Sequence, residues 1–112
     1  MVKQVIWSRL AHNNRFNILD YWAKRNKSVT YSKRLNQIFE NTAELIGKHP
    51  KIGKQTEIQN IRFKIIKDYL FTYRETDNFI EILTIWDSRQ DPEKYEKIIK
   101  KGDSYMSALP RK

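Results

Sequence analysis

The first part of the chain predicts a short strand followed by an amphipathic helix. In residues 3–7, Val5 and Trp7 alternate with polar Gln4, although the apolar Ile6 interrupts the alternation, and we expect a short strand. Ser8 follows at a position where its hydroxyl can cap a helix. From residue 9 to about residue 25, apolar side chains recur at helical spacing with charged residues between them.

A second helix is predicted because its apolar positions fall on one face. These positions are Tyr31, Leu35, Ile38, Phe39, Thr42, Leu45 and Ile46. Ser28 or Thr30 is expected to cap the start of this helix, Gly47 to cap its end, and Pro50 prevents its continuation. Two amphipathic helices with a short connection predict an antiparallel hairpin, which must bury its apolar side against a sheet.

The second half of the chain supplies that sheet. Residues 51–59 predict a loop, and the expected strands then span residues 61–66, 69–74 and 79–86. Lys67-Asp68 and Asp77-Asn78 suit the turns between these strands. The first of them alternates apolar side chains with mostly cationic ones, which indicates two unlike faces. On the last strand, one face is expected to carry Ile80, Ile82, Thr84 and Trp86.

The element order therefore predicts an α+β fold, β-α-α-β-β-β, in which the helical hairpin packs on a mostly antiparallel sheet. Residues 93–101 can add a short helix after Asp91-Pro92, with Tyr95 directed inward. We expect one domain over residues 3–101 and a flexible tail over residues 102–112. Trp7, Trp22 and Trp86 are expected to fill the core.

Charge and composition narrow the possible partners. The chain has 112 residues and a formal net charge of +9, with 9 basic and 3 acidic side chains in residues 1–50. Such a balance suits nucleic acid, the ribosome or an acidic protein. The absence of cysteine excludes disulfides and thiol chemistry, and two distant histidines predict no metal site and no cofactor. No apolar run is long enough for a membrane span or a secretion signal, so a cytoplasmic protein is expected.

Two groups of residues resemble the RelE/ParE superfamily of type II toxin–antitoxin toxins. The first comprises Tyr21-Trp22, Asn26, Ser28, Tyr31, Leu35, Ile38, His49-Pro50 and Ile52-Gly53; the second comprises Ile61-Arg62, Tyr69, Tyr73-Arg74, Ile80-Glu81-Ile82-Leu83 and residues 86–92. The last segment, Trp-Asp-x-Arg-x-Asp-Pro, is the most specific piece. The resemblance covers about residues 3–95 and implies a toxin that inhibits growth when free, in a plasmid-stabilisation module. It also implies a small acidic antitoxin as partner.

The superfamily has two branches with different targets. RelE-like members are ribosome-dependent mRNA endonucleases, whose chemistry needs a base, an acid and cations for the phosphorane. Resemblance to that branch makes Arg89, Tyr95, Arg62 and Lys64 the candidate catalytic residues. Each also has a structural alternative: Arg89 pairs with Asp87 or Asp91, Tyr95 packs the last helix on the sheet, and Arg62 and Lys64 form a solvated strand face.

ParE-like members lack nuclease chemistry and are known for poisoning DNA gyrase. The long hairpin with Tyr-Trp in its first helix resembles this branch more closely, as does the Asp-Pro after Arg89. In addition, Leu70 stands where the RelE-like strand carries an arginine after its first tyrosine. We therefore favour the ParE-like toxin, with the ribosome-dependent nuclease as the alternative. Lys51, Lys54 and Arg74 are the candidate contacts to the target or to phosphate.

Overall fold

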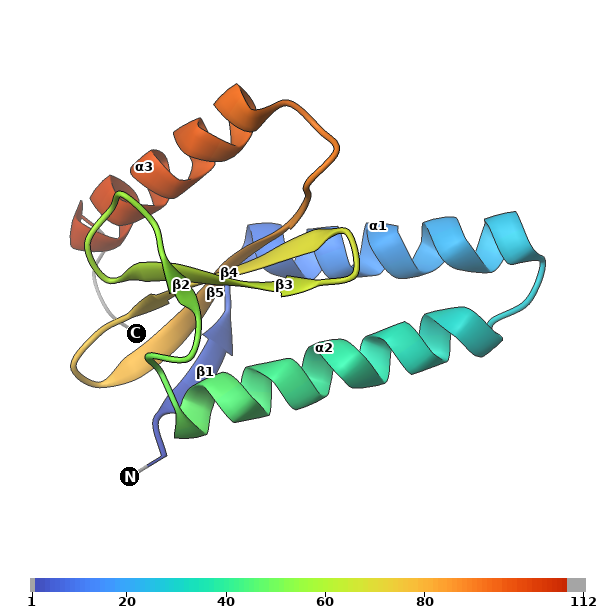
Figure 1. The fold of residues 1–112 in the computed structure, drawn as a ribbon, viewed down its shortest axis with the longest axis horizontal. Coiled ribbons are helices and arrows are strands. Elements are labelled where there is room, and N and C mark those ends of the chain that lie inside the picture. Colours follow the sequence, from blue (N-terminus) through green and yellow to red (C-terminus); the bar gives the residue numbers. More distant parts are fainter. Residues whose placement is uncertain (1, 109–112) are drawn as a thin grey trace.

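The computed structural model describes residues 2–108, and the side chains of residues 2–101. Along the chain it contains β1 (Gln4–Trp7), α1 (Arg9–Asn26), α2 (Thr30–Lys48), β2 (Lys54–Gln55), β3 (Ile61–Ile66), β4 (Tyr69–Glu75), β5 (Phe79–Asp87) and α3 (Pro92–Ala108). This order confirms the predicted α+β fold, and Figure 1 shows the hairpin of α1 and α2 beside the sheet.

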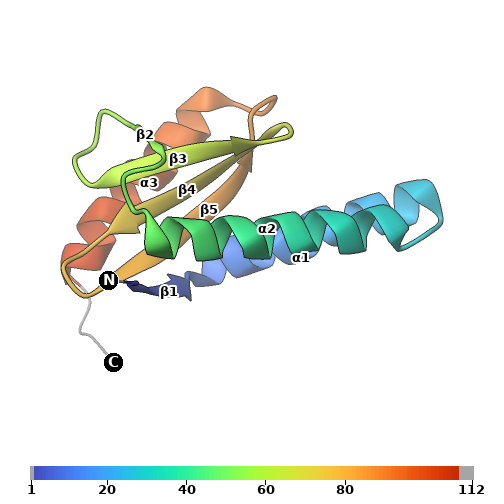
Figure 2. The ribbon, with the colours of Figure 1, turned by 60° about the horizontal axis from the view of Figure 1, so that its bottom comes forward.

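The sheet has the strand order β1-β5-β4-β3-β2. β1 pairs with β5 in parallel, and all other neighbours are antiparallel. The helical hairpin covers one face of this sheet and α3 covers the other, as Figures 1 and 2 show from two directions. The predicted hairpin and mostly antiparallel sheet are therefore confirmed.

Beneath the hairpin lies the larger of two hydrophobic clusters. Phe39 and Leu35 from α2 are fully buried there against Phe71 and Tyr73 of β4 and Ile80 of β5. Trp7 and Trp22 pack against this cluster, as predicted. The Nε1 of Trp22 also donates to the Tyr69 hydroxyl at 2.9 Å, which ties α1 to the sheet. The apolar stripes of the two helices thus have the partner that they require.

The ends of the helices follow the sequence only in part. Ser8 caps α1 as predicted, because its hydroxyl accepts from the Ala11 amide at 3.0 Å. The N-cap of α2 is Val29, so neither Ser28 nor Thr30 occupies that position as predicted. Gly47 was expected to end α2 but lies inside its last turn, where its carbonyl accepts from the Lys3 amide at 3.0 Å. A Cβ there would lie 3.1 Å from the Lys3 carbonyl oxygen, so this glycine permits close packing against the strand segment.

The loop predicted for residues 51–59 contains the short strand β2, which pairs with β3. Tyr73 anchors the beginning of this segment, because its hydroxyl donates to the Pro50 carbonyl at 2.7 Å and accepts from the Gly53 amide at 2.9 Å. A Cβ on Gly53 would approach that hydroxyl to 2.6 Å, so the position requires glycine. A strand of two residues is too short to show an alternation of apolar and polar side chains, so the sequence pattern did not predict β2.

A β-bulge in β5 changes which residues share a face. Thr72 pairs with Thr84 but Tyr73 pairs with Ile82, so Leu83 is the additional residue. Ile80 and Ile82 join the cluster under the hairpin, whereas Trp86 stacks against Tyr95 of α3. The predicted common face of Ile80, Ile82, Thr84 and Trp86 is therefore wrong, because strict alternation cannot anticipate a bulge.

On the other face, α3 packs through a smaller cluster of Ile61, Leu83 and Ile99. The helix continues to Ala108, so residues 102–108 are helical rather than the predicted tail. The helix was predicted to end at residue 101, just before Gly102, although glycine within a helix costs only about 1 kcal/mol relative to alanine. The remaining tail residues, 109–112, lie outside the described residues. Among the described residues, no helix is long and apolar enough to cross a membrane.

Candidate functional site

Arg89 follows β5 and is held by two carboxylates. Its Nε and Nη2 donate to the two oxygens of Asp87 at 3.0 and 2.8 Å, and its amide donates to the same side chain at 2.9 Å. Its Nη1 lies 3.8 Å from Asp68 in the turn between β3 and β4. The hydrogen bond from Arg89 lowers the pKa of the Asp87 carboxyl, and Asp87 in turn raises the pKa of Arg89. This geometry is the predicted structural alternative, with Asp87 rather than Asp91 as the main partner.

Tyr95 packs α3 onto the sheet. Its hydroxyl shares a hydrogen bond of 2.8 Å with the Thr72 Oγ1, and its ring centroid lies 6.2 Å from that of Trp86. Burial raises the pKa of Tyr95, although the bond to Thr72 acts in the opposite direction. A buried phenol with a raised pKa and an occupied hydroxyl is poorly suited to donate a proton to a leaving group.

Arg62 and Lys64 lie on the opposite face of the sheet from Tyr95. In the β3–β4 register, Arg62 pairs with Tyr73 and Lys64 with Phe71, and both partners belong to the cluster under the hairpin. Thr72 lies between these partners on β4 and reaches Tyr95 on the other side. Since successive residues of a strand point to opposite faces, the sheet separates the two cations from the tyrosine.

Arg62 is also distant from Arg89. Its Nη1 donates to the Gly53 carbonyl at 2.9 Å, at the end of β3 nearer to β2. Arg89 reaches Asp68, which follows the other end of β3. The four residue steps from Arg62 to Ile66 span about 13 Å along the strand. The structure therefore does not bring Arg62, Arg89 and Tyr95 into one site.

The three candidate target contacts have different surroundings. Lys51 and Lys3 each approach Glu75 to 2.9 Å, so Lys51 is part of a three-residue ion cluster. Burial would raise the pKa of Glu75, but the hydrogen bonds from both lysines outweigh it and lower that pKa. Lys54 is exposed on the edge strand β2, whereas Arg74 lies on β4 opposite Glu81. Among the described side chains, no group of three or more His, Cys, Asp or Glu residues could hold a metal ion.

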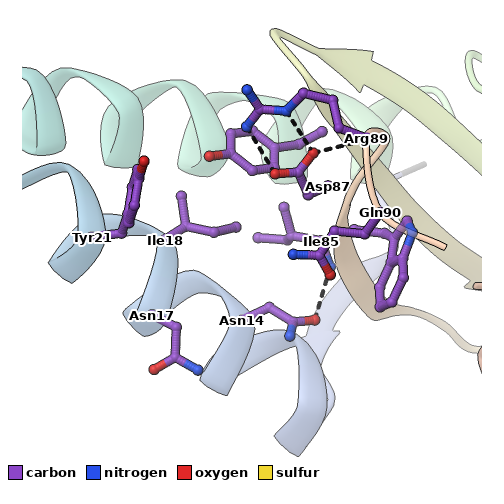
Figure 3. A pocket seen from close by; sticks show the side chains of 10 residues that line it. Asn14, Asn17, Ile18, Tyr21, Ile85, Asp87, Arg89 and Gln90 are labelled. Atoms are coloured by element: carbon purple, nitrogen blue, oxygen red, sulfur yellow. Dashed lines mark hydrogen bonds and ion pairs between the residues drawn. The ribbon is translucent and has the colours of Figure 1, made fainter. Parts of the chain in front are cut away.

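A pocket that the sequence did not predict lies between α1 and the end of β5. Its volume is about 470 Å³, and Figure 3 shows Asn14, Asn17 and Tyr21 of α1 on one side of it. The ion pair of Asp87 and Arg89 lines the other side. The Asn14 Oδ1 accepts from Thr84 Oγ1 at 2.6 Å and from the Ile85 amide at 3.2 Å, which covers the edge of β5 beyond β1. In the sequence, Asn14, Asn17 and Tyr21 have the spacing i, i+3, i+7, which indicates that they share one face of a helix.

A family model described as the ParE toxin of the type II toxin–antitoxin system, parDE, matches residues 5–92. The chain belongs to the ParE toxin family. A solved structure titled "Chromosomal ParDE TA system from P. aeruginosa" contains a chain that is 15% identical, with a TM-score of 0.60. The match covers 77% of this chain and 96% of that one, and at this identity it supports the fold.

A search of curated proteins found no match in sequence. Membership of the ParE toxin family nevertheless confirms the predicted resemblance to the RelE/ParE superfamily and the choice of its ParE-like branch. The protein is thus a toxin of the type II toxin–antitoxin class. The Trp-Asp-x-Arg-x-Asp-Pro motif of residues 86–92 lies at the end of β5, beside the pocket.

Proposed function

We propose that this ParE-family toxin arrests growth by binding a protein target, DNA gyrase, and that a small acidic antitoxin neutralises it. The observation that most supports this proposal is that the residues which a RelE-like nuclease would need at one site lie apart. Arg62 and Lys64 are on the face of the sheet opposite Tyr95, and Arg89 is neutralised by Asp87. Cleavage of RNA without a metal requires an acid, a base and cations around one phosphate.

The target is tested by adding the purified full-length toxin to gyrase and relaxed plasmid. We expect loss of negative supercoiling and accumulation of cleaved plasmid bound to gyrase. Toxin that has been mixed with its antitoxin should have neither effect. Normal supercoiling at a large excess of active toxin would overturn the assignment of gyrase.

The alternative, a ribosome-dependent nuclease, has its own readout. Primer extension on translated mRNA after induction should show no codon-phased cuts if the toxin acts on a protein. Codon-phased cuts in the wild type that disappear in Arg89→Ala would favour the nuclease instead. Both measurements can be made on the same induced culture, so the two functions are separated directly.

An antitoxin has two features on which to dock. The first is the pocket beside α1, where Tyr21 is 52% exposed and, together with Ile18, can receive an apolar side chain. The second is the outer edge of the sheet at β1, which can accept an added strand. The net charge of +9 suits an acidic segment at either place.

The antitoxin is tested by recovering the tagged toxin from its native host, where a small acidic protein should co-purify. Tyr21→Ala should weaken the complex, whereas Val29→Ala, at an exposed site on the hairpin turn, should leave it intact. A plasmid that carries both genes should persist without selection if the pair stabilises plasmids. Recovery of the toxin without an acidic partner would contradict this part of the proposal.

A further inference from the structure

The turn of the helical hairpin carries a dense group of cations. Residues 21–39 contain five basic side chains and no acidic one. They are Lys24, Arg25, Lys27, Lys33 and Arg34, all of them exposed. Figures 1 and 2 show that the turn projects beyond the sheet, away from β2 and from the pairing of β1 with β5. We call these five residues the hairpin tip.

Most of the tip charge is not neutralised by the protein. In the described part of the chain, Lys24 pairs with Asp20 at 2.9 Å, and no ion pair is found for the other four cations. Arg25 places its guanidinium 5.9 Å from the Trp22 ring centroid, which orients the side chain without removing its charge. The tip therefore offers four free cations from two helix ends.

Two of these cations are placed against the preference of their helix. Lys33 and Arg34 lie within the first five residues of α2, where the helix dipole favours anions. The first turn of α2 holds no acidic residue, and Val29 at the N-cap makes no side-chain capping bond. The two cations and the missing side-chain cap both reduce the stability of the first turns of α2. The stability of the fold therefore does not explain the positive charge at this end of the helix.

The tip is built for contact with a backbone of phosphates and not for stacking with bases. Trp22 is held by edge-on contacts with Tyr21 and Tyr31, at centroid distances of 5.2 and 5.1 Å, and by its bond to Tyr69. It cannot turn to receive a base, as proteins that bind single strands require. Duplex DNA presents one negative charge per about 1.7 Å of axis, which makes it a dense target for a projecting group of cations.

We propose that the hairpin tip binds the phosphate backbone of duplex DNA through Arg25, Lys27, Lys33 and Arg34. Binding is independent of sequence, because exposed lysines and arginines at a convex turn contact phosphates and do not enter a groove in a fixed orientation. The inference does not depend on gyrase as the target, since its probe is bare DNA.

The test uses the full-length chain and two variants with the same loss of charge. The tip variant combines Arg25→Gln, Lys27→Asn, Lys33→Gln and Arg34→Gln. The control variant combines Lys67→Asn, Lys94→Gln, Lys97→Gln and Lys101→Gln, which are exposed cations outside the tip. Lys27 and Lys67 both have a positive φ, of 51° and 56°, which asparagine tolerates. Melting curves should show that both variants fold, and the tip variant should melt no lower than the wild type, because it removes two cations from the start of α2.

Affinity for a labelled 30-base-pair duplex is measured at several salt concentrations. Each phosphate contact contributes about 0.9 to the slope of log K against log salt, so the tip variant should lower the slope by about 3 to 4. Its affinity at low salt should fall roughly tenfold or more, whereas the control variant should stay close to the wild type.

Three outcomes would overturn the proposal. One is an equal loss of affinity in the tip and control variants, which would mean that net charge alone attracts the DNA. Another is the absence of duplex binding by the wild type at low salt. The third is a preference for polyglutamate over the duplex that depends on the same four residues, which would make an acidic protein the partner.

Discussion

The two faces of the sheet are covered very differently. Under the hairpin, large side chains such as Phe39, Phe71 and Tyr73 are completely buried in one continuous cluster. Under α3, the buried apolar residues are Ile61, Leu83 and Ile99, joined at the margin by Tyr95. The free energy of folding is therefore concentrated under the hairpin. The cluster under α3 is smaller, and Tyr95 packs at its margin.

The largest expected effect is that of Phe39→Ala on the hairpin side. Phe39 is fully buried and lies 6.1 Å from both Tyr69 and Phe71, measured between ring centroids. Its truncation leaves a cavity that rigid neighbours on a helix and a sheet cannot close. We expect the free energy of unfolding to fall by about 3–5 kcal/mol in urea titrations. A loss below about 1 kcal/mol would show that the main core lies elsewhere.

Ile99→Ala should cost less, although the side chain is also buried. Its cluster has few members, and α3 can move toward the sheet to reduce the cavity. We expect a loss of about 2 kcal/mol, the lower end for such truncations. Ile65→Ala is the matched control, because Ile65 is 65% exposed and should change stability little. A loss for Ile99→Ala as large as that for Phe39→Ala would remove the contrast between the two faces.

Tyr95→Phe should cost about 1 kcal/mol of stability, because it removes the hydrogen bond to Thr72 and keeps the ring. Thr72 retains its bond to the Leu70 carbonyl at 3.1 Å, so no buried hydroxyl is left without a partner. Growth arrest by the induced variant should equal that of the wild type. Full folding together with lost toxicity would indicate a chemical role for the hydroxyl.

The smallest effect concerns the ion cluster of Glu75 with Lys3 and Lys51. Because the folded pKa of Glu75 lies below its ordinary value near 4.5, the cluster stabilises the fold above that pH. This contribution is lost as the pH falls through the lowered pKa. The wild type should exceed Glu75→Gln by less than about 1 kcal/mol at pH 7, and the difference should shrink toward pH 3. A difference that grows on acidification would contradict the assignment.

Much of this arrangement could be predicted from the sequence, because local patterns determine it. The one-sided apolar stripe of α2 and the alternation in β3 each predicted an element within a residue or two of its bounds. Ser8 was predicted as a cap because a hydroxyl before an amphipathic segment has that role.

The remainder depends on contacts between distant segments. The bulge at Leu83 arises from the pairing of β4 with β5, and the short strand β2 from its pairing with β3. The pocket beside Asn14 arises from the packing of α1 against the end of β5. The four candidate catalytic residues were grouped by resemblance, since the sequence does not reveal on which face of the sheet each one lies. The register of the strands determines the face on which each residue lies, and it places Arg62 and Tyr95 on opposite sides of the sheet.

The central claim is that these residues do not form a nuclease site, and growth arrest by the double variant Arg89→Ala/Tyr95→Phe tests it most directly. The account predicts that the folded double variant arrests growth as strongly as the wild type, and that neither protein produces codon-phased cuts in translated mRNA. Loss of arrest in the folded double variant, together with codon-phased cuts by the wild type alone, would contradict it.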